Sequence, residues 1–276
     1  MRHTHGFVVL VALLGGCGPG KELPDATQKV VTGPQTPPPA TIPAASDDKA
    51  KAVVDAALKA TSGGDVARLQ KVKAFRSSGT GLMQRPVGGQ NLNLETTREF
   101  ETVWPNACRL RVESQSLKPF TLGMRRPAVW MREGDQAVPI PDPRAAEESV
   151  AVDTVGHNWI LYLVPLLDPK TVVFDAAQLT VGTKPHNRVK AAVPGYPVFT
   201  LTFDDAHRLV DVEYAHLETG GWITKVLRLD AHKPFDGILL PTKIESVRNG
   251  VAVERWTMTK YQVVEKIDDA AFDAPK

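Results

Sequence analysis

The chain has 276 residues, of which 33 are Lys or Arg and 31 are Asp or Glu, giving a formal net charge of +2 at pH 7. Nucleic-acid binding depends on clustered cationic side chains, and the adjacent pair Arg125 and Arg126 is too small to be such a cluster. We therefore exclude a nucleic-acid partner. The length is sufficient for one large hydrophobic core.

A short apolar segment, residues 7–14, lies near the N-terminus, after Arg2 and before Gly15, Gly16 and Cys17. A helix that spans a bilayer needs about 20 apolar residues, so this segment is too short to remain in a membrane. A charged start, an apolar middle and small residues at the end are typical of a secretory signal. The terminal cysteine makes the segment resemble the lipobox of bacterial lipoproteins, and an ordinary signal peptide that happens to contain a cysteine is the alternative. We interpret residues 1–16 as a lipoprotein signal peptide.

The lipobox resemblance implies that Cys17 becomes the N-terminus and carries acyl chains. One acyl chain binds a membrane only marginally, whereas more than one holds a protein there stably. Gly18 follows the cysteine, in place of the aspartate that marks inner-membrane retention in enteric-type bacteria. The resemblance therefore predicts a lipid-anchored protein on the periplasmic face of the outer membrane.

Residues 18–48 are rich in proline and poor in large apolar side chains. Proline favours extended polyproline II, which spans about 3.1 Å per residue, and such a composition cannot bury enough apolar surface to fold. We predict that residues 17–48 form a lipidated, disordered tether. Residues 49–276 are predicted to form one folded domain.

Two helices are predicted at the start of this domain. Ser46 or Asp47 can cap a helix whose apolar residues, within 50–58, recur at helical spacing, and Gly63 lies in the turn that ends it. Asp65 is predicted to cap a second, shorter helix over residues 66–72.

Strands are predicted from Phe75 onward, where the spacing of apolar residues changes to every second position. The clearest alternating runs are residues 199–203, 209–217, 222–229, 238–247 and 251–264. Asn249 and Gly250, between the last two runs, are a strong hairpin signal because a type I′ turn needs positive φ at both positions. The pattern predicts an antiparallel meander.

A helical pattern over residues 144–167 interrupts the predicted sheet, and Pro165 ends or kinks it. Such an insert can be a lid over the sheet, or it can be core that packs on one sheet face. The sequence leaves both interpretations open. A further helix start is predicted near Phe174, with Asp175 as its cap.

Sequence motifs for catalysis or metal binding are few. The histidines after the signal segment show no paired metal-ligand spacing; they are His157, His186, His207, His216 and His232. We expect His216 and His232 to lie near strand ends, partly solvated. Patterns for serine hydrolases, phosphate-binding loops and dinucleotide binding are missing from the sequence. We predict no catalytic residue, no metal site and no cofactor.

Two polar features have alternative interpretations. Asp204, Asp205 and His207 form the richest polar cluster, and a turn is favoured over a metal or general-base site because Asp bonds locally to the backbone. Cys108 has no partner left once Cys17 is lipidated, and we interpret it as a small buried apolar side chain rather than a reactive thiol.

Large apolar side chains on the predicted strands and insert suit a pocket for flexible chains, because aromatic rings are broad and methionines adaptable. The candidate ligand-cavity residues are Trp130, Trp159, Leu163, Leu201, Phe203, Trp222, Trp256 and Met258. Aromatic residues in strands are more often core, and this alternative stays open because the sequence does not show which sheet face is concave.

Several short motifs together resemble the LolA/LolB-like superfamily of periplasmic lipid and lipoprotein carriers, over nearly the whole chain from about residue 49. In chain order, these motifs are residues 62–64, 65–72, 79–81, 130–135, 201–204, 240–244 and 267–275. The resemblance implies a mainly β (α+β) fold, in which a curved antiparallel sheet forms an incomplete β-barrel closed by N-terminal and inserted helices.

In that family a hydrophobic interior accommodates acyl chains, and there is no catalytic constellation to carry over. Together with the lipobox, the resemblance implies a membrane-anchored periplasmic lipoprotein that binds a lipid or other hydrophobic ligand noncovalently. LolA is soluble, whereas the predicted anchor is a feature shared with LolB. The alternatives are a noncatalytic scaffold that holds an envelope protein partner and, less favoured, a hydrolase that uses the cluster at His207.

Overall fold

The computed structural model describes residues 40–87, 90–218 and 221–274. The predicted signal peptide, Cys17 and most of the predicted tether lie outside these ranges. Contacts with the domain begin at Ser46, whose hydroxyl accepts a hydrogen bond from the backbone N–H of Val173 over 2.9 Å.

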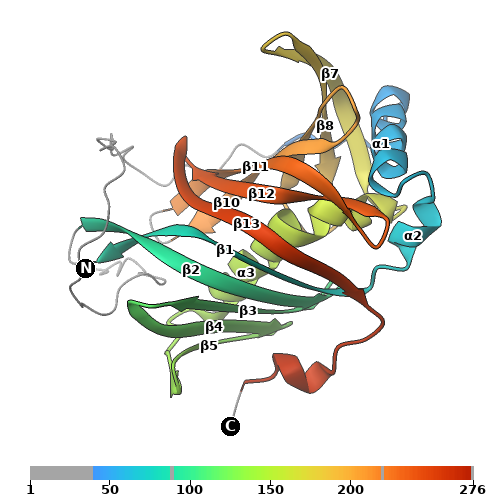
Figure 1. Ribbon diagram of the computed structural model, residues 1–276. Helices are drawn as coiled ribbons and strands as arrows, with labels where there is room; N and C mark the ends of the chain where they lie inside the picture. Colours follow the sequence, from blue (N-terminus) through green and yellow to red (C-terminus); the bar gives the residue numbers. More distant parts are fainter. Residues whose placement is uncertain (1–39, 88–89, 219–220, 275–276) are drawn as a thin grey trace, which may run out of the picture.

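Most of the domain is one antiparallel sheet that contains 13 strands within the described residues. In chain order the strands are β1(Ala74–Val87), β2(Gln90–Val103), β3(Ala107–Ser114), β4(Leu117–Arg125), β5(Ala128–Glu133), β6(Gln136–Ala137), β7(Val172–Val181), β8(Lys184–Ala192), β9(Val198–Phe203), β10(Leu209–Glu218), β11(Gly221–Phe235), β12(Ile238–Arg248) and β13(Val251–Val264). Their spatial order is β6-β5-β4-β3-β2-β1-β13-β12-β11-β10-β9-β8-β7. The sheet curves strongly and is not closed, because β6 and β7 end it without pairing to each other (Figure 1). The predicted fold class is confirmed.

The C-terminal meander forms from the turns that the sequence predicts. Asn249 and Gly250 both have positive φ, 46° and 85°, as a type I′ turn requires. They join β12 to β13, in which Arg248 pairs with Val251. Only short segments of the sequence separate successive strands here, and β9 to β13 pair in chain order.

Helix α1(Asp48–Thr61) begins after Asp47, which is one of the two caps that the sequence allows. The Asp47 carboxylate accepts a hydrogen bond from the Ala50 backbone N–H over 2.6 Å, and Ala50, Ala57 and Leu58 are buried. Helix α2(Val66–Gln70) also forms, with Leu69 buried, but Asp65 makes no side-chain capping bond, so that detail of the prediction is wrong.

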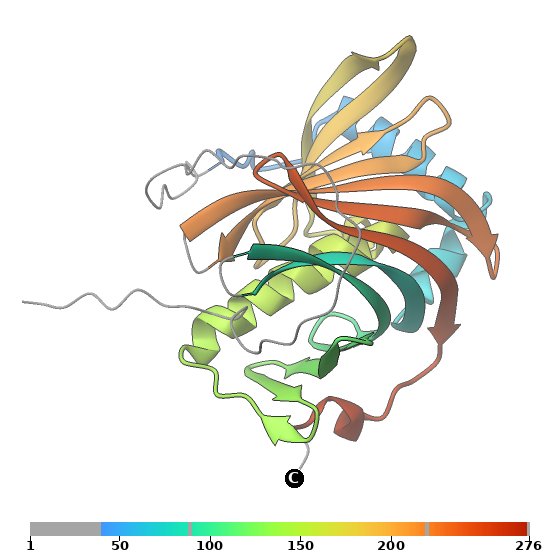
Figure 2. The same ribbon diagram turned by 60° about the vertical axis from the view of Figure 1, so that its left-hand side comes forward.

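The predicted helical insert is present between β6 and β7. It comprises α3(Pro143–Thr154), the π-helix η1(Val155–Trp159) and two 3₁₀ turns, η2(Ile160–Tyr162) and η3(Val164–Leu167). Figure 2 shows α3 on the concave side of the sheet, between the strands of its two halves. The insert therefore lies where it can close the open side of the half-barrel.

The hydrophobic core is formed where the insert meets the concave face. Trp159 and Leu163 are fully buried, and the Trp159 ring lies 5.0 Å from Phe75 and 5.2 Å from Trp104, measured between ring centroids. Tyr162 lies 4.5 Å from Phe75 in the same way. The insert thus fills the interior with its own aromatic side chains.

The helix start predicted at Phe174 is wrong, because this segment belongs to β7. Asp175 has a φ of 59° and lies at a register shift between β7 and β8, so it forms a β-bulge. Its carboxylate pairs with the Lys190 ammonium at 2.6 Å. Asp175, which the sequence suggests as a helix cap, is therefore a residue of the bulge.

Candidate functional site

Six of the eight predicted cavity residues come together on the concave side. Trp159 and Leu163 belong to the insert, and the other four lie on β9 and β13. All six are at most 4% exposed and belong to one apolar cluster; they are Trp159, Leu163, Leu201, Phe203, Trp256 and Met258. The structure thus places residues far apart in the sequence around one interior.

Trp130 and Trp222 lie on the opposite, convex face. Trp222 is 38% exposed, because it alternates along β11 with the inward-facing Lys225 and Leu227. Trp130 lies against Gly123, and its indole N–H donates to the backbone oxygen of Phe272 over 2.7 Å, which holds the C-terminal segment on the outside of the sheet.

Two glycines of β1 make room for the large side chains of β13. A Cβ at Gly81 would lie 2.0 Å from the Arg255 backbone oxygen and 2.8 Å from the Trp256 ring. One at Gly79 would lie 2.6 Å from the Thr257 backbone oxygen and 3.0 Å from the Met258 sulfur. Glycine in a strand interior is typical of such close approach. The motif from Gly79 to Gly81 therefore shapes the concave surface.

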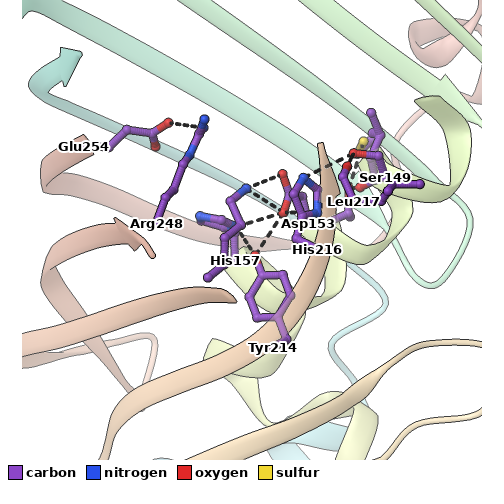
Figure 3. Close-up of polar contacts among 12 residues, drawn as sticks. Ser149, Asp153, His157, Tyr214, His216, Leu217, Arg248 and Glu254 are labelled. Carbon is purple, nitrogen blue, oxygen red and sulfur yellow. Dashed lines mark hydrogen bonds and ion pairs between the residues drawn. The ribbon is translucent and has the colours of Figure 1, made fainter. Parts of the chain in front are cut away.

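A group of charged and polar side chains lies beside the apolar cluster, under α3, and is centred on Asp153 (Figure 3). The Lys225 ammonium, on β11, contacts the two carboxylate oxygens of Asp153 at 2.7 and 2.8 Å. The Tyr214 hydroxyl, on β10, donates to the same carboxylate over 3.0 Å. Burial by itself would raise the pKa of Asp153, but the Lys225 charge, the two neighbouring histidines and the Lys225 hydrogen bond together outweigh it and hold that pKa well below its usual value. Asp153 is therefore an anion at neutral pH.

Two histidines complete this group, and both are neutral at pH 7. Burial lowers the pKa of His157 to about 3 and that of His216 to about 4, and the nearby Lys225 charge acts in the same direction. The His157 Nδ1 lies 2.8 Å from the Tyr214 hydroxyl. The expected solvation of His216 is wrong: it is 4% exposed, because α3 covers this end of β10.

Ser149, His216 and Asp153 stand in the order of a hydrolase triad. Ser149 Oγ lies 3.2 Å from His216 Nε2, and His216 Nδ1 lies 3.3 Å from an Asp153 oxygen. Lys225 already binds the Asp153 carboxylate, however, and His216 Nδ1 has no hydrogen bond of acceptable geometry among the described residues. Ser149 also lies in the interior of α3, where backbone N–H groups bond within the helix and are not free to stabilise an oxyanion. The contacts fasten α3 to β10.

The charged group continues across the sheet to β2. Glu254 on β13 lies 3.6 Å from the Arg248 guanidinium on β12 and accepts a hydrogen bond from the Trp256 indole over 3.2 Å. The Arg98 guanidinium, on β2, lies over the Trp256 ring with its carbon 4.9 Å from the ring centroid. Burial would raise the pKa of Glu254, but the surrounding positive charges lower it.

Sequence reasoning missed Asp153, Lys225 and Arg98. They lie on different elements, so no spacing connects them. One signal exists for Lys225: it occupies an inward position in the alternation that continues with Leu227 and Leu229, where a charge needs a buried partner.

The other sequence-predicted polar features are structural. The Asp204 carboxylate accepts hydrogen bonds from the backbone N–H groups of Ala206 and Arg208, at 3.0 and 2.9 Å, which confirms the turn. Within the described residues, His, Cys, Asp and Glu form no group of three that could hold a metal ion. Cys108 is 1% exposed and burial raises its pKa to about 12, which agrees with a buried apolar side chain rather than a reactive thiol.

Two surface hollows, of about 270 and 260 Å³, lie on the convex face and not beneath α3. The first lies over β1 to β3 and is lined by polar side chains such as Thr97 and Glu113. The second lies between the loop at Pro127 and the C-terminal segment. Neither contains a residue of the concave apolar cluster.

Comparisons with protein-family models and with curated protein sequences find no match. Among solved structures, a LolA superfamily protein from Nitrosomonas europaea superposes with a TM-score of 0.53 at 10% identity, over 82% of this chain and 97% of that one. The domain has the LolA fold. A putative outer membrane lipoprotein-sorting protein domain from Vibrio parahaemolyticus covers 81% of this chain and 97% of its own, at 9% identity and a TM-score of 0.46. A DUF1329 family protein from Desulfovibrio piger reaches a TM-score of 0.47 at 10% identity, over 82% of this chain and 98% of that one.

The LolA-like domain includes no membrane-spanning helix among its described residues, since none of those helices combines the required length and apolar character. Any attachment to a membrane through the predicted lipid depends on Cys17, outside the described residues.

Proposed function

We propose that the chain is a membrane-anchored envelope lipoprotein whose LolA-like domain binds a lipid or other hydrophobic molecule noncovalently, on the concave face beneath the insert. The observation that supports this most is the apolar cluster that joins the concave face to the insert, from Leu201 through Trp159 to Met258. An acyl chain in that place would gain about 25 cal/mol for each Å² of apolar surface removed from water.

The insert occupies the place that a ligand would take, so binding requires it to move. Its backbone is irregular: the π-helix η1 is followed by two 3₁₀ turns, and Leu163 between them has a left-handed φ of 55°. A left-handed residue with a side chain costs roughly 1–2 kcal/mol, and 3₁₀ turns have poorer hydrogen-bond geometry than an α-helix. These features give the segment from Val155 to Leu167 a less regular backbone than helix α3, and we place the required movement there.

The experiment is uptake of a fluorescent acyl probe by the chain from residue 40 onward, which contains every described element. We expect saturable binding of the probe and competition by unlabelled fatty acid, together with lipid in an organic extract of the purified protein. A domain that takes up no probe and yields no lipid would contradict the proposal. If crosslinking in the cell envelope then recovered a protein, the scaffold alternative would be favoured.

A further inference from the structure

Among the residues that the structure describes, Arg98 is a buried cation without an ion-pair partner. Its side chain points from β2 into the concave interior, the residue is 7% exposed, and its Nε has no hydrogen-bond partner among the described residues. Its guanidinium lies over the Trp256 ring, which contributes a cation–π contact but accepts no hydrogen bond in the guanidinium plane.

The nearest carboxylate does not neutralise Arg98. Glu254 is the carboxylate whose charge acts most strongly on Arg98. Its two oxygens, however, contact other groups. Oε1 faces the Arg248 guanidinium at 3.6 Å, and Oε2 accepts from the Trp256 indole at 3.2 Å. Within the part of the chain that the structure describes, no carboxylate forms an ion pair with Arg98.

Among the described residues, the ion pairs under α3 therefore leave Arg98 as the unpaired cation. Lys225 is paired with Asp153, and Arg248 with Glu254. The two histidines there are neutral at pH 7, for the reasons given above. Among the described residues of this group one positive charge is left over, on Arg98. A buried charge without a partner is costly, and a bound anion would offset that cost.

Arg98 also marks the boundary between apolar and polar surface. The next inward-facing residue of β2, Phe100, belongs to the apolar cluster, as do Trp256 and Met258 across the sheet. On the other side lie Arg248 and Asp153, whose side chains are 33% and 34% exposed and so open toward solvent. An amphiphile with its chain under the insert would place its headgroup at this boundary.

We propose that the ligand is an amphiphile with an anionic headgroup, a carboxylate or a phosphate, which pairs with Arg98. This inference rests on the proposed function. The planar guanidinium suits both anions, because its parallel N–H groups can bind two oxygens at once. Arg248 and Lys225, both on neighbouring strands, add positive potential around the headgroup and leave their own carboxylate pairs intact.

The test compares three ligands that share one acyl chain: oleate, oleoyl lysophosphatidate and the uncharged monoolein. The protein is the chain from residue 40 onward, as wild type and as Arg98→Gln. We expect wild type to prefer at least one of the two anions over monoolein by about tenfold or more, and Arg98→Gln to lose that preference while it still binds monoolein. Arg255→Gln, an exposed position beside Trp256 on the convex face, is the matched control and should change nothing. The anion that binds more tightly distinguishes a carboxylate from a phosphate ligand.

The outcomes separate the two proposals. Equal binding of all three ligands by wild type, or an anion preference that survives in Arg98→Gln, would overturn the headgroup assignment and leave hydrophobic binding intact. Failure of wild type to bind any of the three would remove the proposed function itself. If Arg98→Gln does not fold, Arg98→Lys replaces it in the test, because lysine keeps the positive charge but lacks the planar guanidinium. An undiminished preference for anions in Arg98→Lys would count against recognition by paired guanidinium N–H groups.

Discussion

At the scale of single residues, the pair of Lys225 and Asp153 has the largest energetic consequence. The Lys225 side chain is 3% exposed, and that of Asp153 is 34% exposed. Removing one partner of a buried pair leaves the other charge without compensation, which costs more than the pair itself contributes. The pair links helix α3 of the insert to β11, so its loss should also loosen the insert.

We predict that Lys225→Met destabilises the domain by about 2–3 kcal/mol, a range below that for fully buried pairs because Asp153 is partly solvated. Chemical denaturation measures the change. Lys243→Met, at an exposed position of β12, is the matched control and should have an effect within about 0.5 kcal/mol. The double variant with Asp153→Leu should recover part of the loss, because no unpaired carboxylate then remains.

The two histidines predict how stability depends on pH. Their pKa values in the folded state, about 3 for His157 and about 4 for His216, lie below the ordinary value of 6.5. The unfolded chain therefore binds more protons between these values, and stability should fall as pH drops below about 6.5. Each histidine contributes at most about 1.4 kcal/mol per pH unit.

Denaturation midpoints at pH 7 and pH 5 check this prediction, and His216→Asn should reduce the slope. A stability that stays constant over this interval would contradict the neutral, buried state of the histidines.

At the scale of elements, the proposed binding requires the insert to move as a lid. Helix α3 is fastened to three separate strands: Thr154 donates to the Cys108 sulfur on β3 over 3.2 Å, Ser149 contacts His216 on β10, and Asp153 contacts Lys225 on β11. Opening the lid must break these contacts together, while the sheet behind them keeps its strand pairing.

We predict that a disulfide between Cys108 and Thr154→Cys locks the lid. The Thr154 oxygen is 3.2 Å from the Cys108 sulfur, so a cysteine there needs only a small rotation to reach a bond length of about 2.0 Å. Oxidised protein should bind the acyl probe about tenfold more weakly or worse, and reduction should restore binding. Thr154→Ser, which keeps the hydroxyl and adds no thiol, should bind equally under both conditions. Full binding by the oxidised variant would show that the ligand enters without movement of α3.

At the scale of the whole molecule, the folded domain begins its contacts at Ser46, and everything before residue 40 lies outside the described residues. If Cys17 is lipidated, the proline-rich segment connects the concave site to a membrane surface and raises the local concentration of membrane-derived ligands. With that anchor, the proposed site could exchange amphiphiles with the leaflet that holds Cys17.

The anchor gives a separate prediction. Cys17→Ala should prevent incorporation of labelled palmitate and move the protein from the membrane to the soluble fraction of the cell envelope, because no acyl chain then holds it. The isolated domain should keep its affinity for the acyl probe, since Cys17 lies outside the described fold. Membrane retention of the unlabelled variant would refute the lipid anchor as the means of attachment.

Local signals in the sequence were sufficient for much of the fold. The Asp47 cap, the turn at Asp204 and the hairpin at Asn249 and Gly250 are decided by bonds and backbone angles within a few residues, so their sequence neighbours determine them. The helical insert was predictable for the same reason. Asp175 was misread because a bulge and a helix cap both place a polar residue at a backbone irregularity.

Only the tertiary structure decided which face of each strand points inward, and with it the site. The alternation of side chains along β11 and β5 is the same whichever face of the sheet is concave. The sequence therefore could not show that Trp222 and Trp130 face outward while Trp256 faces inward. Asp153 pairs with Lys225, and Arg98 lies in the same interior over Trp256, because the curved sheet brings β2, β11 and the insert together. The pattern of neighbouring residues determines helices, strands and turns. The pairing of buried charges depends on residues from distant strands, and no short-range signal in the sequence encodes it.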